Sequence, residues 1–314
     1  MERNHQRFLV QVLPSLAAKH GIALTELPQS NGWVFRLSKD GRQGYLFGYD
    51  FGLNNATSML VADDKCATWD ALTLAGVPCV EHVLFLNPAI RQKYVDDAGN
   101  WDSMREYLRR HDEGVVCKPN NGTGGIDVEL ACTMVALETI VQRLFAVYPS
   151  VCLSPFASID DEYRCVVLDG TVETCFRKIR PEITGDGKRT LRELIADLPD
   201  ELIRRMPWRP EVLSSQHTVV PEGMRFPLEW RHNLAFGAYP EIVSEASVET
   251  LAVRAAEAID LRFGSVDVIR SRQGLSVLEI NSGVMMERFA RTSPGHHAIA
   301  VEIYSRVLSL FPFE

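Results

Sequence analysis

Three side chains near the end of the chain have the types and spacing of a metal site. Asp267 lies in one apolar run, Glu279 and Asn281 lie in the next, and residues 272–274 form a glycine-containing turn between them. A β-hairpin over residues 263–286 would bring the three side chains together. Carboxylate and amide oxygens are the hard ligands that Mg²⁺ prefers, so the pattern predicts a magnesium site. The alternative is a strand that carries ordinary solvated carboxylates.

The apolar pattern of the second run bears on this choice. Val277 and Leu278 are adjacent and interrupt the alternation of residues 275–280, which predicts a strand covered on both faces. A carboxylate buried in such a strand needs a cation or a metal as its partner.

A lysine and a glycine-rich loop upstream have the features of a phosphate site. Residues 114–119 form a short apolar run that contains Lys118, and residues 120–125 follow as Asn-Asn-Gly-Thr-Gly-Gly. Glycines allow backbone amides to approach a phosphate, and a lysine supplies a point charge. The residue order of a P-loop is absent, and an ordinary glycine-rich hairpin turn is the alternative. The predicted phosphate contacts are Lys118, Gly122, Thr123, Gly124 and Gly125.

Two further positions place cations where an anion could bind. Lys65 lies at the start of a helix predicted over residues 63–74, where the helix dipole disfavours a cation. It is therefore either solvent-exposed or held there to meet a phosphate. Residues 177–181 are strongly basic and precede a glycine-containing turn at residues 185–190. This basic run is either a solvated face or an anion site, and we favour the anion site because several cations are concentrated close to the glycine-containing turn.

The remaining pattern predicts the elements that hold these residues in place. Alternation predicts hairpins at residues 32–49 and 163–176, the second with an Asp-Gly turn at residues 169–170. Thr190, followed by Glu193, predicts the start of a helix. Residues 199–210 are rich in Pro, Arg and Trp and predict an irregular connection. Apolar residues recur at helical spacing in residues 8–20, 101–111, 134–145, 248–259 and 297–310.

The composition argues against several classes of protein. The chain has 314 residues, of which 46% are hydrophobic and 24% charged, and its formal net charge is −8. These values predict a globular protein whose main partner is neither nucleic acid nor a membrane. Residues 1–10 contain no apolar run, and no segment approaches the roughly 20 apolar residues of a membrane span. The seven cysteines lack Cys-x-x-Cys spacing, and most of them have apolar neighbours that predict buried thiols, so we expect a cytoplasmic protein.

These signals occur in an order that resembles the ATP-grasp superfamily, in its peptide-bond-forming branch. Asp64 and Lys65 with residues 75–78 are similar to the family's entry helix, and Lys118 with the glycine loop is similar to its phosphate-covering lid. Residues 180–195 are similar to the Arg-x-Pro-x-x-Val-x-Gly-Asp-Gly-x-x-Thr-x-x-Glu-Leu-Ile segment of cyanophycin synthetase and of glutathione synthetase-type enzymes. The resemblance covers roughly residues 63–281.

The resemblance implies an α+β protein with the ATP-grasp fold, in which two α+β subdomains sandwich ATP. A small N-terminal α/β domain would span residues 1–62, a lid subdomain residues 63–150, and a metal-binding subdomain residues 151–314. Two departures from the family stand out: Ser154 replaces a common Glu, and residues 282–288 replace a Pro-Gly turn after Asn281.

The resemblance also implies a role for each candidate residue. Arg180, Lys178 and Asn281 would be catalytic, and Asp267, Glu279 and Asn281 would hold the metal. The nucleotide contacts would be Lys65, Lys118, Gly122, Thr123, Gly124, Gly125, Ser154, Pro155, Phe156, Ala157, Glu162 and Asn233.

The implied activity is that of an ATP-dependent carboxylate-amine ligase that forms an amide or peptide bond through an acyl phosphate. Its cofactors would be ATP and Mg²⁺, with Mn²⁺ as a substitute, and its substrates would be a small carboxylate and an amine such as an amino acid or peptide. We expect a homodimer. The alternatives are an ATP-grasp kinase that phosphorylates a small molecule and a non-catalytic nucleotide-binding protein.

Overall fold

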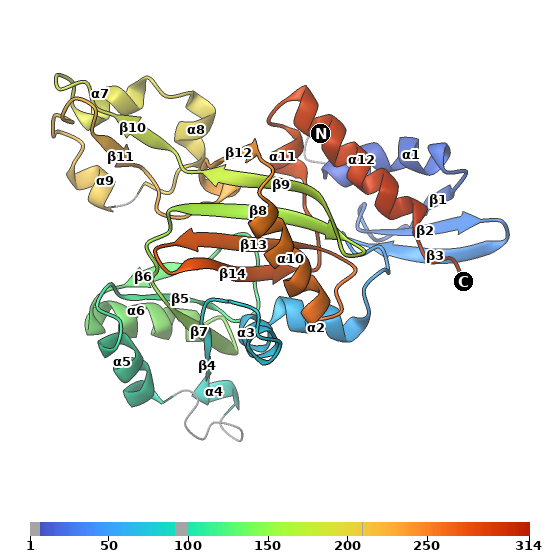
Figure 1. The fold of residues 1–314 in the computed structure, drawn as a ribbon, viewed down its shortest axis with the longest axis horizontal. Coiled ribbons are helices and arrows are strands. Elements are labelled where there is room, and N and C mark those ends of the chain that lie inside the picture. Colours follow the sequence, from blue (N-terminus) through green and yellow to red (C-terminus); the bar gives the residue numbers. More distant parts are fainter. Residues whose placement is uncertain (1–6, 92–99, 209) are drawn as a thin grey trace. The chain divides into compact units, whose positions relative to one another are not determined.

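The computed structural model describes residues 7–91, 100–208 and 210–314 (Figure 1). The chain divides into two compact units. The first comprises Met1–Cys175 and Ser244–Glu314, and the second comprises Phe176–Val243. The predicted three-part division at residues 62 and 150 remains a prediction.

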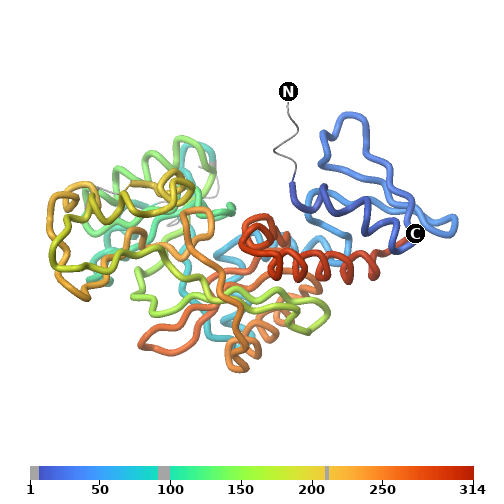
Figure 2. Tube along the Cα trace, turned by 90° about the horizontal axis from the view of Figure 1, so that it is seen from above, coloured from blue at the N-terminus to red at the C-terminus, as the bar shows by residue number. Residues whose placement is uncertain are grey.

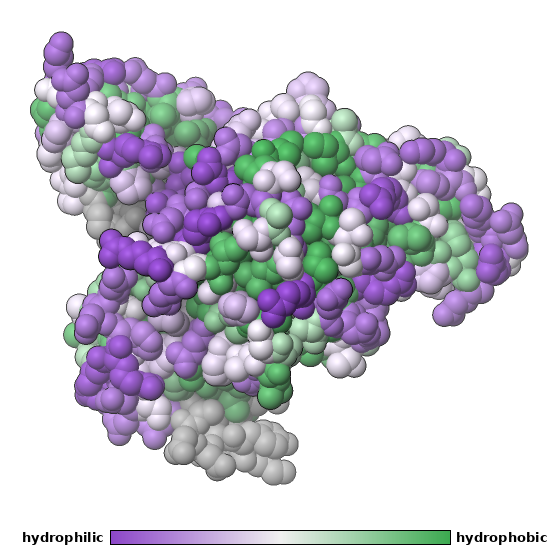
Figure 3. Space-filling view, viewed as in Figure 1, coloured by the Kyte–Doolittle hydropathy of each residue, from purple (hydrophilic) through white to green (hydrophobic). Residues whose placement is uncertain are grey.

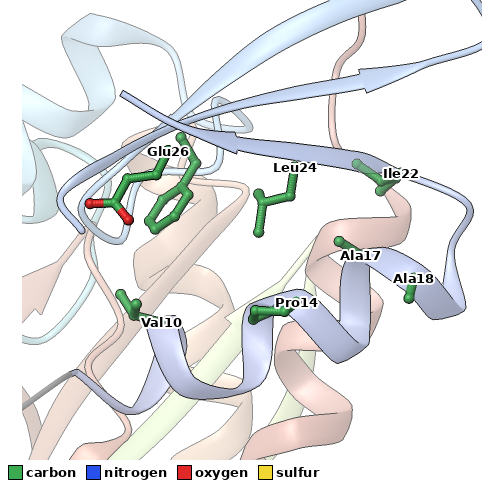
Figure 4. A pocket seen from close by; sticks show the side chains of 8 residues that line it. Val10, Pro14, Ala17, Ala18, Ile22, Leu24 and Glu26 are labelled. Atoms are coloured by element: carbon green, nitrogen blue, oxygen red, sulfur yellow. The ribbon is translucent and has the colours of Figure 1, made fainter. Parts of the chain in front are cut away.

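The first unit begins with a helix and a three-stranded antiparallel sheet. The elements are α1 (Phe8–Lys19), β1 (Ala23–Glu26), β2 (Val34–Lys39) and β3 (Arg42–Phe47), and the last helix of the chain is α12 (Pro294–Ser309). The sheet order is β1-β2-β3, and Gly41 takes the left-handed conformation in the turn between β2 and β3, which confirms the predicted hairpin. Helix α12 lies beside α1 (Figure 2). Pro14 of α1 and Leu24 of β1 line a cavity of about 470 Å³ (Figure 4).

A four-stranded antiparallel sheet carries the glycine loop. Its elements are β4 (Val83–Leu86), β5 (Val115–Pro119), β6 (Glu129–Ala131) and β7 (Ser150–Pro155), with helices α4 (Pro88–Arg91), α5 (Trp101–Arg109) and α6 (Met134–Phe145). The order is β4-β7-β5-β6, so the loop at residues 120–125 connects two neighbouring strands. Apolar side chains of α5 and α6, such as Met104 and Leu137, pack on the sheet with Val115 and Leu153. The predicted helices and the strand before the glycine loop are confirmed.

A second sheet of the first unit carries the predicted metal ligands. Its elements are β8 (Asp161–Leu168), β9 (Thr171–Ile179), β13 (Phe263–Ser271) and β14 (Gly274–Asn281), with helices α2 (Ala56–Asp63), α3 (Lys65–Leu74), α10 (Ala246–Ala258) and α11 (Glu287–Ala290). The order is β9-β8-β13-β14, and the predicted Asp169-Gly170 turn joins β8 to β9. Hydrophobic residues gather around α10 in the view of Figure 3, whereas the tip of the β2–β3 hairpin is hydrophilic.

Strand β14 corrects one prediction from the sequence. It ends the sheet and is half-buried, so it is not covered on both faces as residues 275–280 predicted. The alternation is interrupted because the register with β13 shifts: Asp267 pairs with Glu279, but the next residue, Val268, pairs with Val277. This β-bulge leaves Leu278 as the extra residue and keeps Val277 on the buried side.

The second unit is a small α+β unit with its own core. Strand β9, which begins in the first unit, pairs here with β12 (Tyr239–Ile242), and β10 (Glu182–Thr184) pairs with β11 (Arg225–Pro227). Ile183, Leu191 and Leu228 belong to its apolar core. The helical elements are α7 (Leu191–Ala196), α8 (Asp200–Arg205), α9 (Pro210–Ser214) and the 3₁₀ turn η2 (Leu234–Phe236).

The prediction of an irregular connection at residues 199–210 is wrong in part, because α8 forms within this segment. Its first turn is acidic, with Asp200 and Glu201, and its last turn is basic, with Arg204 and Arg205. Both ends therefore complement the helix dipole. The predicted start of α7 is confirmed, because Thr190 and Glu193 form a reciprocal capping box.

Candidate functional site

The three predicted metal ligands are brought together at the β13–β14 hairpin. Asp267 on β13 lies directly opposite Glu279 on β14, and Asn281 Nδ2 donates a hydrogen bond to Glu279 Oε1 at 3.0 Å. Asp267 is 2% exposed. Two carboxylates and an amide thus cluster at one sheet edge.

Arg164 on β8 is a site residue that the sequence analysis missed. Its Nε and Nη2 donate to the two carboxylate oxygens of Asp267 at 2.7 and 2.6 Å. Burial disfavours the charged guanidinium, but Asp267, Glu279 and Glu162 outweigh it and raise the pKa of Arg164. The signal available in the sequence was its position two residues after Glu162, which places both side chains on one face of a strand.

The donor set fits a hard divalent cation. Across the residues described, no group of three or more His, Cys, Asp and Glu side chains is arranged to hold a metal. The predicted set is different in kind, because it combines two carboxylates with the Asn281 amide. A carboxylate oxygen can accept a hydrogen bond from a guanidinium and bind a cation at the same time, so the ion pair of Asp267 with Arg164 is compatible with a cation.

Lys65 is held at the N-terminus of α3 by the glycine loop. Asp64 caps this helix by accepting a hydrogen bond from the Ala67 backbone N–H at 2.8 Å. The buried Lys65 Nζ donates to the backbone carbonyl oxygens of Gly122 at 2.7 Å and Asn120 at 3.3 Å. The solvent-facing alternative for this lysine is therefore wrong.

Lys118 on β5 is a second buried cation of the same region. Burial lowers its pKa, and the charge of Lys65 lowers it further, whereas the Glu279 carboxylate acts in the opposite direction. Burial and the Lys118 charge also hold the pKa of His82 well below its ordinary value. His82 is thus a buried neutral imidazole near Lys118, another residue that the sequence analysis missed.

The glycine loop has the backbone freedom that was predicted for it. Gly124 and Gly125 have φ values of 75° and 71°, in the left-handed region that favours glycine. Asn120 is buried, and its Oδ1 accepts a hydrogen bond from the Cys66 backbone N–H at 3.2 Å. The loop is thereby attached to the start of α3.

One cavity of about 210 Å³ joins the two halves of the predicted site within the first unit. Lys65, Gly122 and Thr123 line it on the phosphate side, and Glu279 and Asn281 line it on the metal side. The structure therefore brings together five of the predicted residues around one space. Further lining residues, which the sequence analysis did not assign, are Trp33, Tyr49, Ala62, Asp63, Ile280, Ser282, Gly283 and Met285.

The predicted adenine and ribose contacts lie on other strands of the first unit. Ser154 and Pro155 end β7, and Phe156 follows, with its backbone N–H donating to the Gly114 carbonyl at 3.0 Å. Glu162 is buried on β8. These residues, with Ala157, are outside the described lining of the 210 Å³ cavity, and their nucleotide contacts remain predictions.

The predicted catalytic residues Arg180 and Lys178 belong to the second unit, as does Asn233. Arg180 Nη1 donates to the Trp230 carbonyl at 3.4 Å, and Lys178 is buried on β9. Asn233 caps η2, because its Oδ1 accepts from the Ala235 backbone N–H at 2.7 Å. The roles of these three residues remain predictions.

The second unit also contains a charged cluster that the sequence did not indicate. Glu229 is fully buried and accepts hydrogen bonds from Arg231, both from its backbone N–H and from its guanidinium, each at 3.0 Å. The Arg231 guanidinium lies 4.0 Å from the ring centroid of Phe236. The Nδ1 atom of the neighbouring His232 lies 2.8 Å from the Lys178 carbonyl oxygen, at hydrogen-bonding distance, as expected for a histidine with a structural role.

Comparison with known proteins shows what the chain is similar to. Residues 191–305 match the RimK-like ATP-grasp domain. The glutathione biosynthesis bifunctional protein of Streptococcus thermophilus is 25% identical over 270 residues, covering 72% of this chain and 35% of that protein. A probable alpha-L-glutamate ligase of Shewanella baltica is 25% identical over 180 residues, covering 57% of this chain and 46% of that protein.

The fold agrees with this match. The crystal structure of a bifunctional glutathione synthetase from Pasteurella multocida aligns with a TM-score of 0.55 and 16% identity, over 96% of this chain and 44% of that one. The chain thus spans less than half the length of these three relatives. No helix in the described part of the chain has the length and apolarity needed to cross a membrane. The chain has the ATP-grasp fold, its residues 191–305 match the RimK-like ATP-grasp domain, and its sequence is similar to that of glutathione synthetase-type ligases.

Proposed function

We propose that this protein is an ATP-dependent carboxylate-amine ligase that forms an amide bond through an acyl phosphate. The observation that carries the proposal is the 210 Å³ cavity, which has Lys65 and the glycine loop on one side and Glu279 and Asn281 on the other. A phosphate-binding loop and a cation-binding carboxylate cluster around one space are what transfer of the ATP γ-phosphoryl group requires.

The residues of the first unit have separate tasks in this proposal. Lys65 and Lys118 neutralise phosphate charge, and backbone amides of the glycine loop approach the phosphate oxygens. Asp267, Glu279 and Asn281 would hold Mg²⁺, or Mn²⁺ in its place, which shields the charge that develops on the phosphoryl group. Burial strengthens these interactions because water screens them less.

The reaction consists of two displacements. An oxygen of the substrate carboxylate bonds to the γ-phosphorus of ATP while the bond to the β–γ bridging oxygen breaks, which gives an acyl phosphate and ADP. The amine nitrogen then bonds to the acyl carbon, the bond to the phosphate oxygen breaks, and phosphate leaves as the nitrogen loses a proton. We propose Lys178 and Arg180 as the further catalytic cations on the basis of the sequence resemblance.

The relatives suggest the kind of substrate. They are named for glutathione biosynthesis and for glutamate ligation, so we propose an amino acid or a short peptide as one or both substrates. The seven cysteines are all free thiols, which supports the cytoplasm as the proposed location. A homodimer is the proposed assembly.

The experiment that tests the proposal follows three products at once. The protein is incubated with ATP, Mg²⁺ and pooled amino acids, and ADP, free phosphate and product mass are measured. ADP with free phosphate and an amide product supports the ligase. A phosphorylated product without free phosphate would instead identify a kinase, and binding of ATP without its consumption would identify a nucleotide-binding protein.

A further inference from the structure

The metal end of the 210 Å³ cavity continues into an apolar wall that the proposed chemistry does not use. Trp33, Tyr49 and Met285 line this wall. Trp33 is 44% exposed and Met285 is 52% exposed, so both side chains are accessible to a ligand. Exposed apolar side chains that line a cavity next to reactive groups are typical of a binding site for an apolar group.

The two aromatic side chains of this wall are held in place by charged residues behind them. The Arg7 guanidinium lies 4.1 Å from the ring centroid of Trp33 and 5.2 Å from that of Tyr49. It also donates to the backbone carbonyl oxygens of Gly48, at 3.1 Å, and of Gly32. Arg7 is thus a positioning residue, because its charge is directed at carbonyl groups and at the two rings.

Tyr49 is fixed in the same way from the other side. Its hydroxyl donates a hydrogen bond to Glu287, and burial together with this carboxylate raises the pKa of Tyr49. The phenol therefore stays neutral, and its hydroxyl is already engaged. The ring is left as the part that a ligand can contact.

Met285 is presented to the cavity by a pinned loop. Val284 and Met286 are buried on either side of it. The buried Tyr304 hydroxyl donates to the Val284 carbonyl at 2.7 Å and accepts from the Met286 backbone N–H at 3.2 Å. This anchoring turns the intervening side chain outward, and it falls in the segment 282–288 that replaces the Pro-Gly turn of the family.

The charged side chains among the described residues that line the cavity are Lys65, Asp63 and Glu279, and none of them belongs to the apolar wall. An amino acid or peptide residue has polar reacting backbone groups and a side chain that extends away from them. The polar residues of the lining match those backbone groups, and the apolar wall matches the side chain.

Building on the proposed ligase function, we propose that the substrate at the metal site carries an uncharged apolar side chain, of the size of leucine, methionine or phenylalanine. Trp33, Tyr49 and Met285 determine this specificity by contacting that side chain. The flexible thioether of Met285 adapts to branched and aromatic shapes alike.

The test compares substrates that differ in polarity at similar size. ADP release is measured with leucine against asparagine, and with methionine against glutamine, as free amino acids and as dipeptides. We expect kcat/KM to favour the apolar member by about tenfold or more, the scale on which apolar pockets discriminate. Equal or reversed preference overturns the inference.

Variants locate the effect. Trp33→Ala and Met285→Gln should each raise KM for the apolar substrate about tenfold, and KM for ATP should stay unchanged. Tyr45→Ala is the matched control, because Tyr45 is 56% exposed on β3 and lies outside the described lining of the cavity. Should Trp33→Ala fail to fold, Met285→Gln on an exposed side chain keeps the test intact. A KM in these variants equal to that of the control contradicts the assignment.

A binding measurement separates this inference from the proposed function. Calorimetry with leucine or methionine in the presence of Mg²⁺ and ADP reports on the cavity without turnover. Saturable binding that Met285→Gln abolishes, in a protein that never consumes ATP, would refute the ligase and support the apolar site. Amide formation without any preference for apolar substrates would support the ligase and refute the apolar site.

Discussion

The ion pair between Arg164 and Asp267 offers the sharpest test of the site's electrostatics. Replacing Arg164 by Met keeps most of the side-chain volume but leaves Asp267, which is 2% exposed, as a buried carboxylate without its cation. Breaking a buried pair in this way typically costs about 3–5 kcal/mol. Because the Arg164 side chain is itself 26% exposed, we expect the lower end of this range, about 3 kcal/mol.

The assay is thermal and urea unfolding of matched variants. A loss of about 3 kcal/mol should lower Tm by about 4–5 °C in a chain of this size. Arg262 and Asp169 form the control pair, because they are also bidentate, at 2.8 and 3.0 Å, but their side chains are 48% and 39% exposed. Arg262→Met should therefore cost less than about 1 kcal/mol.

A double variant shows whether the buried charge is the cause. Asp267→Asn in the Arg164→Met background removes the unpaired charge and should recover part of the lost stability. Adding Mg²⁺ should also raise the Tm of Arg164→Met more than that of the unmodified protein, because a bound cation can replace the guanidinium. The reasoning is refuted if Arg164→Met and Arg262→Met destabilise equally, or if the double variant is no more stable than Arg164→Met.

The remaining predictions concern turnover, binding and stability. Glu279→Gln should abolish ATP turnover and leave the Tm nearly unchanged, and wild-type rates would remove Glu279 from the metal site. Lys118→Met should weaken ATP binding by at least about tenfold in calorimetry, because charge-assisted hydrogen bonds contribute about 1.5–3 kcal/mol, and unchanged affinity would remove this lysine from the site. Tyr304→Phe should lower the free energy of unfolding by about 1–3 kcal/mol, since the Val284 carbonyl and the Met286 N–H lose their partner; an unchanged urea midpoint would contradict this. Burial raises the pKa of Cys117 to about 12 and that of Tyr304 well above its ordinary value, so above about pH 9 the unfolded chain releases protons that the folded chain keeps. The free energy of unfolding should therefore fall between pH 8 and pH 11, and urea midpoints that stay level over this range would contradict the prediction.

Local features of this fold were predictable from the sequence because they depend on neighbouring residues. The Asp169-Gly170 turn and the capping box of Thr190 and Glu193 are confirmed as predicted. The β13–β14 hairpin is also local, so the approach of Asp267 to Glu279 followed from turn spacing alone. The bulge in that hairpin did not, since adjacent apolar residues fit a buried strand as well as a register shift.

The partners of the site residues were not predictable, because they depend on which distant strands become neighbours. Arg164 reaches Asp267 because β8 pairs with β13, with Arg164 and Asp267 in direct register. No feature near Arg164 in the sequence indicates that pairing. Lys65 is similar: its position at a helix start was visible, but its hydrogen bond to the Gly122 carbonyl requires the glycine loop to lie against α3.

The contact between Lys65 and the glycine loop links the order of the loop to the chemistry proposed for it. Lys65 Nζ has three N–H donors, and two of them are directed at the carbonyl oxygens of Asn120 and Gly122. A phosphate that takes a hydrogen bond from this ammonium therefore joins a group that already holds the loop, and competes with the loop carbonyls for its charge. We therefore expect binding of the nucleotide to be coupled, through this one side chain, to rearrangement of residues 120–125. Trp33 and Met285 line the same cavity but belong neither to the glycine loop nor to α3, so we expect a substrate to be selected by its side chain independently of how the loop responds to ATP.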